Sequence, residues 1–294
     1  MSSPVRLMIA AVGAAVLALS ACSSSGGAGS ASGGKHSGDV DVLSAGSLVT
    51  VVQKALAPGL KSTSGYTVEN FSAGSKDLAA DIKGKVKQGD VFISASPATN
   101  ATLEGSANGS WVSWYATFAT SQLVLGYNPH STFAAALKSK PWYDVITEPG
   151  LRIGLTPPAS DPKGALAVQA LGDTAKAKGL PALTAIGTKA ANQFPETSLA
   201  AEVSAGQLDV GFFYQAEANA ANIPTVPLTG VDLKATYTVT VLKHAPHEAA
   251  AEAFVTYLLS SAGTAALKKY GFDLVTPVTR SGTGVPASLT SVVH

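Results

Sequence analysis

The stretches DVDVLSAGSLV (Asp39–Val49), YTVENFSAGSKDL (Tyr66–Leu78) and DVFIS (Asp90–Ser94) decide the fold of this chain. Each contains an apolar or alternating run that predicts a strand, and the first two continue through an Ala-Gly-Ser turn into a helical pattern. The order strand, helix, strand, helix, strand is typical of a mainly parallel sheet with helices on both faces. The sequence therefore predicts an α/β fold.

The rest of the chain also contains predicted strands and predicted helices. Further strands are predicted at 122–127, 151–156, 210–214 and 236–242, and further helices at 162–172, 199–205, 247–261 and 263–270. Residues 276–294 have no clear periodicity, so we expect a surface tail there. The full length of 294 residues suits two modest α/β lobes, and we expect a monomer.

The first residues predict export. Arg6 precedes an apolar run at 7–19 that is too short for an ordinary membrane span, and Leu19-Ser20-Ala21-Cys22 resembles a bacterial lipobox. We therefore expect a signal peptide at 1–21, a lipid on Cys22 and a Ser/Gly-rich tether at 22–38. Cys22 is the only cysteine, so an intramolecular disulfide is excluded. These features predict an extracytoplasmic protein anchored to the cell membrane.

The charge balance excludes some partners. Removing residues 1–21 deletes one arginine and leaves 19 basic and 19 acidic side chains. A balanced chain lacks the positive excess that nucleic acids and anionic membrane surfaces attract. We expect no nucleic-acid partner.

The turns between strands and helices carry the chemistry. Ser47 and Ser75 each stand at a predicted helix start, and Asp161-Pro162 and Pro195-Glu196 mark two more. Free N–H groups and the positive end of the helix dipole make such starts suitable for anions. In an open α/β sheet these turns gather at the carboxyl ends of the strands. The pattern favours a cleft that binds a compact anion through uncharged donors.

Six motifs in the same order resemble the molybdate-binding ModA proteins, and more closely their tungstate/molybdate-binding WtpA branch. The resemblance runs from about residue 41 to residue 278. Its motifs are Ala45-Gly46-Ser47, Ser72-Ala73-Gly74-Ser75, Gly89–Ser96, Trp142–Ile146 with Pro149, Asp161-Pro162-Lys163-Gly164, and Val210–Tyr214.

The resemblance implies a periplasmic-binding-protein fold of class II, with two lobes, a hinge and a ligand cleft. Residues 39–120 and 236–294 would form lobe 1 and residues 121–235 lobe 2, with crossings near 118–122 and 233–237. The family implies the solute-binding component of an ABC importer, which binds molybdate or tungstate and works with an ABC permease. Neither a cofactor nor catalysis is expected.

The resemblance also implies a ligand site. Ser47 and Ser75 would contribute hydroxyl and N–H donors from lobe 1. Backbone N–H groups near Lys163 and Glu196 would contribute from lobe 2, and the hydroxyl of Tyr214 would complete the shell.

One position departs from the WtpA pattern. That pattern has a glutamate directly before the matching tyrosine, paired with the aspartate of the Asp-Pro turn, and both raise the coordination number of the metal. Phe213 occupies the glutamate position here, whereas Asp161 is present. We therefore expect a tetrahedral anion, with Asp161 as a helix cap and a possible extra contact.

Other readings remain open. The ligand could be a sulfate-like anion or a small organic solute. A secreted hydrolase has little support, because the chain lacks a G-x-S-x-G motif and no histidine is near the serine turns. A metal-binding lipoprotein would depend on the pair His244 and His247. Trp111, Trp114 and Tyr115 could form a sugar platform, or pack near the hinge.

Overall fold

The computed structural model describes residues 38–293, which belong to one compact unit at 35–294. The predicted signal peptide, the lipidation site Cys22 and nearly all of the tether lie outside the described residues. Within 38–293, no helix combines the length and apolar character needed to cross a membrane.

The described part alternates strands and helices. The strands are β1 (Asp39–Ala45), β2 (Thr67–Ala73), β3 (Val91–Ser94), β4 (Trp114–Tyr127), β5 (Ile153–Gly154), β6 (Val210–Tyr214), β7 (Thr225–Pro227), β8 (Lys234–Val241) and β9 (Asp273–Gly282). The helices are α1 (Val49–Val51), α2 (Ala57–Ser64), α3 (Ser75–Lys83), α4 (Pro97–Ala101), α5 (Ala134–Ser139), α6 (Trp142–Val145), α7 (Pro162–Lys178), α8 (Ala182–Thr188), α9 (Glu196–Ser204), α10 (Gln215–Ala220), α11 (Glu248–Leu259) and α12 (Ser261–Lys269). A π-helical turn, η2 (Val52–Leu56), joins α1 to α2.

The strands form a mixed sheet in the order β2-β1-β3-β8-β4-β6-β5, and β7 and β9 also pair with β4. The pairs β1–β2, β1–β3 and β5–β6 are parallel, whereas β8 and β4 are antiparallel to their neighbours. The predicted α/β fold is therefore confirmed. We call the part around β1, β2 and β3 lobe 1, and the part around β5, β6 and β7 lobe 2.

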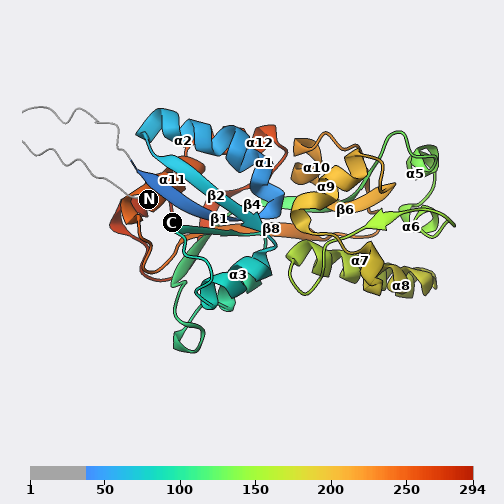
Figure 1. Cartoon of the computed structure of the whole chain (residues 1–294), viewed down its shortest axis with the longest axis horizontal. Coiled ribbons are helices and arrows are strands. Elements are labelled where there is room, and N and C mark those ends of the chain that lie inside the picture. Colours follow the sequence, from blue (N-terminus) through green and yellow to red (C-terminus); the bar gives the residue numbers. More distant parts are fainter. Residues whose placement is uncertain (1–37, 294) are drawn as a thin grey trace, which may run out of the picture. The chain divides into compact units, whose positions relative to one another are not determined.

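Alternation along β1 builds both faces of lobe 1. Val42 and Leu43 are both buried, but they belong to different hydrophobic clusters because successive side chains point to opposite faces. Val42 packs with the cluster that includes Leu60 of α2, and Leu43 packs with the cluster that includes Leu78 of α3. Figure 1 shows α2 and α3 on opposite sides of these strands.

Lobe 2 repeats this arrangement on β6, all of which is buried. Phe212 belongs to the cluster that contains Ala167 of α7, and Phe213 to the cluster that contains Leu199 of α9. Figure 1 shows α7 and α9 on opposite sides of β6. The two predicted faces of helices are thus present in both lobes.

Strands β4 and β8 connect the lobes. β4 pairs with β8 up to Gln122 and with β6 from Leu123 onwards, so one continuous strand passes between the two parts of the sheet. The register between β4 and β8 shifts at Phe118, where the strand contains a bulge. Both predicted crossings therefore contain paired strands, and the proposed lobe boundaries stay predictions.

The expected surface tail is partly wrong. Residues 273–282 form β9, which pairs antiparallel with β4, and Leu289 is buried in the core. Most side chains of β9 are exposed, so the strand lacks the apolar alternation that would have revealed it. Trp114 is also buried in the core, and Trp111 and Tyr115 pack against the smaller cluster of lobe 1, which supports packing over a sugar platform.

Candidate functional site

The two serine turns follow neighbouring strands. β1 and β2 pair in parallel with Ala45 opposite Ala73, so the turns after them lie at the same edge of the sheet. Ser47 lies in a 3-10 turn, η1 (Gly46–Leu48), and Ser75 is the first residue of α3. Both serines are buried, and the hydroxyl oxygen of Ser75 accepts the N–H of Ala95 at 3.1 Å.

The first turn holds a carboxyl group from lobe 2. The N–H groups of Gly46 and Ser47 donate to Oε2 and Oε1 of Glu196 at 2.8 and 3.0 Å. Glu196 is the first residue of α9 and is buried. A Cβ atom on Gly46 would lie 2.5 Å from Oε2 of Glu196, so a side chain at position 46 would force the carboxyl group to move. The predicted donors at Ser47 and the predicted residue Glu196 are thus brought together, with the Glu196 side chain as the acceptor.

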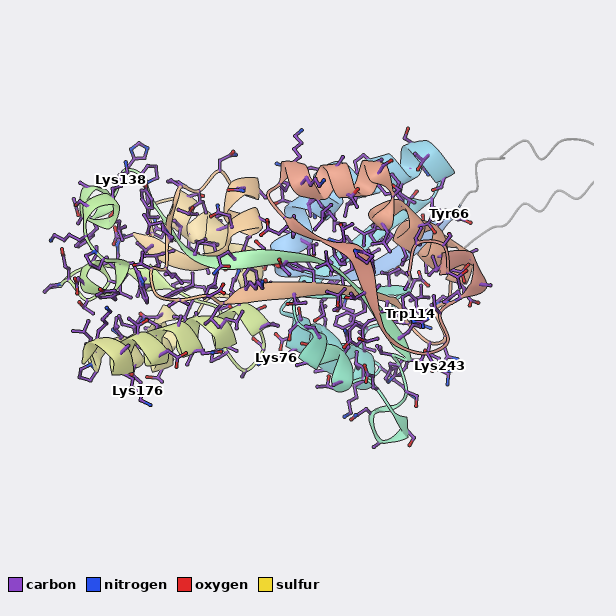
Figure 2. The ribbon with its side chains drawn as sticks, turned by 180° about the vertical axis from the view of Figure 1, so that it is seen from behind. Tyr66, Lys76, Trp114, Lys138, Lys176 and Lys243 are labelled. Carbon is purple, nitrogen blue, oxygen red and sulfur yellow. The ribbon has the colours of Figure 1, made fainter. Side chains whose placement is uncertain are left out.

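The second turn contacts the loop before α7. The N–H groups of Lys76 and Asp77 both donate to the carbonyl oxygen of Ser160, at 3.1 and 3.3 Å. The ammonium of Lys76 donates to the carbonyl oxygen of Pro158 at 2.7 Å. Figure 2 labels Lys76 where the start of α3 meets this loop. Both serine turns of lobe 1 therefore face lobe 2.

Asp161 caps α7, as its position before a proline predicts. Its Oδ1 accepts the N–H groups of Lys163 and Gly164 at 2.8 and 3.3 Å and the hydroxyl of Thr156 at 2.7 Å. The backbone donors expected near Lys163 are therefore engaged at the helix start in this structure.

The side chain of Lys163 lies at the centre of the site. Its ammonium is fully buried, 2.6 and 2.7 Å from the two carboxylate oxygens of Glu217 and 3.7 Å from Oε1 of Glu196. Burial by itself lowers the pKa of Lys163, but the charges of Glu217 and Glu196 outweigh it, and the pKa is raised. Lys163 therefore stays cationic.

Burial raises the pKa of the acidic groups of the site, whereas by itself it lowers the pKa of a lysine. Burial and then the neighbouring Asp161 raise the pKa of Glu196 well above its ordinary value, and burial also raises the pKa of Glu217. Burial therefore favours the protonated form of Glu196. Oδ2 of Asp161 has no hydrogen-bond partner among the described residues.

Two tyrosines close the site. The rings of Tyr214 and Tyr237 are fully buried with centroids 6.1 Å apart, and the Tyr237 hydroxyl lies 3.1 Å from the Ser47 hydroxyl oxygen. The Tyr214 hydroxyl has no hydrogen-bond partner among residues 38–293. Burial raises the pKa of both phenols, so they remain neutral donors. An uncommitted donor at Tyr214 suits a ligand oxygen.

Sequence reasoning missed three components of this site: the ammonium of Lys163, the carboxylate of Glu217 and the hydroxyl of Tyr237. Glu217 stands three residues after Tyr214 and accepts its N–H at 3.3 Å, a spacing typical of a helix start. That spacing was a usable signal for Glu217. Tyr237 looked like an ordinary strand residue.

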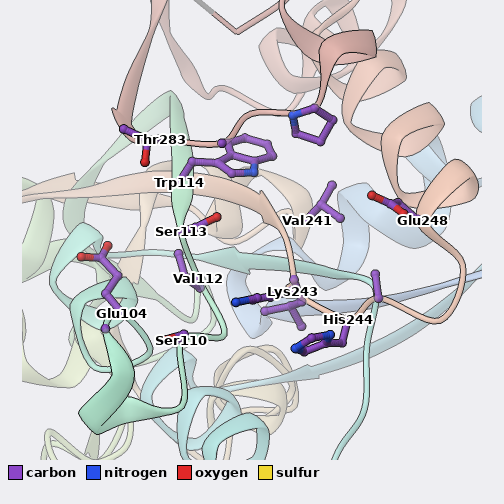
Figure 3. Close-up of a pocket in the computed structure, with 15 residues that line it drawn as sticks. Glu104, Ser110, Val112, Ser113, Trp114, Val241, Lys243, His244, Glu248 and Thr283 are labelled. Atoms are coloured by element: carbon purple, nitrogen blue, oxygen red, sulfur yellow. The ribbon is translucent and has the colours of Figure 1, made fainter.

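The histidine pair does not belong to this site. His247 lies 3.0 Å from Asp90, whose carboxylate also accepts the N–H groups of Asp41 and His247, so Asp90 acts as a structural acceptor in lobe 1. His244 lines a separate cavity of about 760 Å³ in lobe 1, together with Trp114 and other residues (Figure 3). None of the site residues described above lines that cavity.

The two-lobed α/β fold, with the helix starts of one lobe facing those of the other, defines the class of periplasmic binding proteins. A solved structure with this fold, the periplasmic molybdate-binding protein of Azotobacter vinelandii, matches 81% of this chain and 100% of its own, with a TM-score of 0.57 and 19% identity. Residues 40–273 match the sequence model of the family described as bacterial extracellular solute-binding protein. The chain belongs to this family.

Two relatives refine the comparison. A protein of Haloferax volcanii that carries the name of an ABC transporter molybdenum-binding protein is 32% identical over 197 residues, which cover 66% of this chain and 61% of the relative. The chain therefore spans about three-fifths of that relative's length. The molybdate/tungstate-binding protein WtpA of Thermococcus kodakarensis is 24% identical over 237 residues, which cover 63% of this chain and 67% of that protein.

Proposed function

We propose that this protein is the extracytoplasmic solute-binding component of an ABC importer and that its solute is a tetrahedral oxyanion, molybdate or tungstate. The observation that carries the proposal is the pair of N–H groups at Gly46 and Ser47, which hold both oxygens of a carboxyl group in this structure. Two converging N–H groups that bind two oxygens of an anion form an anion subsite. The names of the relatives point to the same ligand class.

The remaining donors are arranged around that subsite. The hydroxyl of Ser47 is within hydrogen-bond distance of Tyr237, Tyr214 has an uncommitted hydroxyl, and Lys163 supplies a buried positive charge. Uncharged donors and one cation bind a dianion while allowing its release to a permease. We propose Ser47, Ser75, Lys163, Glu196 and Tyr214 as site residues, with Lys163 and Glu196 acting through their side chains.

Phe213 supports fourfold rather than sixfold coordination. Its ring lies in the hydrophobic cluster with Leu199, and the Lys163 ammonium is 5.6 Å from the ring centroid. No carboxylate therefore projects from position 213. We propose that the metal of the oxyanion keeps its four oxygen ligands.

The cellular setting is part of the proposal. Residues 1–21 would be removed as a signal peptide, and a lipid on Cys22 would anchor the protein outside the cytoplasm. The partner would be an ABC permease, and the protein would act as a monomer that binds its solute without chemical change. The basis is the lipobox-like sequence before Cys22 and the family to which the chain belongs.

Isothermal titration calorimetry of the purified protein with molybdate, tungstate, sulfate and phosphate tests the proposal. We expect saturable binding of molybdate and tungstate and weaker binding of sulfate. Phosphate is informative because hydrogen phosphate carries a proton that it can donate to Oδ2 of Asp161, whereas molybdate does not. Preference for phosphate or sulfate would replace the ligand assignment, and no binding of any of the four would contradict an oxyanion site.

A further inference from the structure

The first turn of lobe 1 already holds a carboxyl group, and that group is part of the chain. Glu196 lies 150 residues after Gly46, and its carboxyl group takes the N–H of Gly46 and the N–H of Ser47 together. The same two N–H groups are the strongest candidates for the solute. The site therefore contains a donor pair with two possible acceptors.

We propose that Glu196 is an internal competitor of the solute: its carboxyl group occupies the anion subsite at Gly46 and Ser47 and has to leave before an oxyanion binds there. This inference rests on the proposed function, because it takes the oxyanion to use this subsite. Nothing in the family comparisons assigns such a role to the residue.

Geometry makes the two acceptors mutually exclusive. Each N–H group carries one hydrogen, and the distances of 2.8 and 3.0 Å show that both hydrogens are used by Glu196. The space in front of Gly46 is also filled, since even a Cβ atom there would lie 2.9 Å from the carboxyl carbon of Glu196. An oxyanion and the Glu196 carboxyl group cannot both fit against this turn.

The displaced carboxyl group has a partner within reach. Oε1 of Glu196 lies 3.7 Å from the ammonium of Lys163. A small rotation away from the first turn exchanges two N–H donors for this cation, so the carboxyl group stays paired while the solute binds. Lys163 contributes to the competition in this way, as well as to the charge of the site.

The carboxyl group of Glu196 also affects which ligands can bind at this turn. A free carboxylate offers the turn the same two oxygens that Glu196 offers and must also lose its translational freedom on binding. Glu196 therefore excludes small carboxylic acids, whereas a dianion with four oxygens has further donors at the site, such as the hydroxyl of Tyr214, to compensate for the exchange. The site should take inorganic oxyanions in preference to organic acids.

Replacing the competitor tests this inference. Molybdate and tungstate titrations are compared for the wild type, Glu196→Ala and Glu202→Ala, which changes a partly exposed glutamate of the same helix. If Glu196 occupies the subsite nine-tenths of the time, its removal tightens the apparent Kd about tenfold. We expect this for Glu196→Ala, together with new binding of acetate, and no change for Glu202→Ala. Unchanged or weaker oxyanion binding by Glu196→Ala would overturn the inference.

A second measurement needs no solute. Amide hydrogen exchange at Gly46 and Ser47, measured without added oxyanion, should be faster in Glu196→Ala than in the wild type and unchanged in Glu202→Ala. Equal exchange rates would show that Glu196 does not hold the turn. If neither protein binds any oxyanion but the exchange rates differ, the contact is real and the proposed function fails instead. Should Glu196→Ala fold poorly, Glu196→Gln keeps the volume while offering the turn one acceptor oxygen.

Discussion

The ammonium of Lys163 lies 2.6 Å from Oε1 of Glu217, and solvent reaches 0% of the lysine side chain and 9% of the glutamate side chain. The pair joins the first turn of α7 to α10 through two residues that are 54 positions apart in the chain. A buried ion pair depends on both partners, because removing one leaves the other uncompensated in a low dielectric.

Lys163→Met should therefore be strongly destabilising. We expect a loss of about 3–5 kcal/mol in the free energy of unfolding, because Glu217 and Glu196 would lose the cation that they share. Urea denaturation followed by circular dichroism measures this loss. Lys176→Met, on the exposed side of the same helix, is the control and should change stability by less than about 0.5 kcal/mol. A similar small effect for Lys163→Met would contradict the pairing.

Alanine substitutions at two glycines should change the stability of the fold in opposite directions. Gly46→Ala places a methyl group 2.5 Å from the Glu196 carboxylate, so it should cost about 1–3 kcal/mol and break the contact between the lobes. Gly172→Ala, inside α7 with open space around it, should stabilise by about 0.5–1 kcal/mol. Thermal unfolding of both variants checks the signs. Stabilisation by Gly46→Ala would mean that Glu196 does not approach this turn in solution.

The serine hydroxyls have separable roles. Ser75→Ala leaves the buried N–H of Ala95 without its acceptor and should cost about 1–3 kcal/mol of stability. Ser47→Ala removes a bond to Tyr237, and each hydroxyl that donates to a charged solute contributes about 1.5–3 kcal/mol to binding.

Calorimetric titration of molybdate into the Ser47→Ala/Ser75→Ala double variant should show that summed loss in affinity. Ser139→Ala, on the exposed end of α5, serves as control. Wild-type affinity in the double variant would place the oxyanion elsewhere.

Stability should fall as pH rises above the usual range for glutamate. Burial raises the pKa of Glu196 in the folded chain, so the folded state holds a proton that the unfolded state has released, and this favours folding at lower pH. Glu217 contributes with the same sign, whereas the raised pKa of Lys163 keeps that group charged throughout the interval.

Glu196→Gln should flatten this dependence. Melting temperatures measured at about pH 5 and about pH 8 should differ more for the wild type than for the variant. A wild type that gains stability over this interval would show that Glu196 titrates normally.

Much of the fold was predictable because its strands are buried on both faces. β3 reads as a continuous apolar run and β1 as a buried strand, a pattern that parallel sheets impose. β9 escaped prediction because its exposed side chains carry no alternation. Hydrophobic periodicity therefore reports burial, and an edge strand with little burial leaves no signal.

Local sequence predicted the backbone turns of the site, but it did not predict how the side chains pair. The turns at Ser47 and Ser75 follow from local sequence, and the structure brings both against lobe 2. The ion pair of Lys163 with Glu217 depends on tertiary contacts across 54 residues, which no local pattern encodes. Phe213 stands where the WtpA pattern has a glutamate, yet Glu196 and Glu217 bring carboxyl groups to the site from other helices.

The bulge at Phe118 has a mechanical consequence. β4 and β8 pass between the lobes as neighbouring strands of one ladder, so any change in the angle between the lobes has to twist a double-stranded ribbon as a unit. Phe118 is the residue of β4 without a partner in that ladder, and torsion concentrates where pairing is interrupted. The flexibility of the connection between the lobes therefore depends on the register of β4 and β8 rather than on the length of a loop.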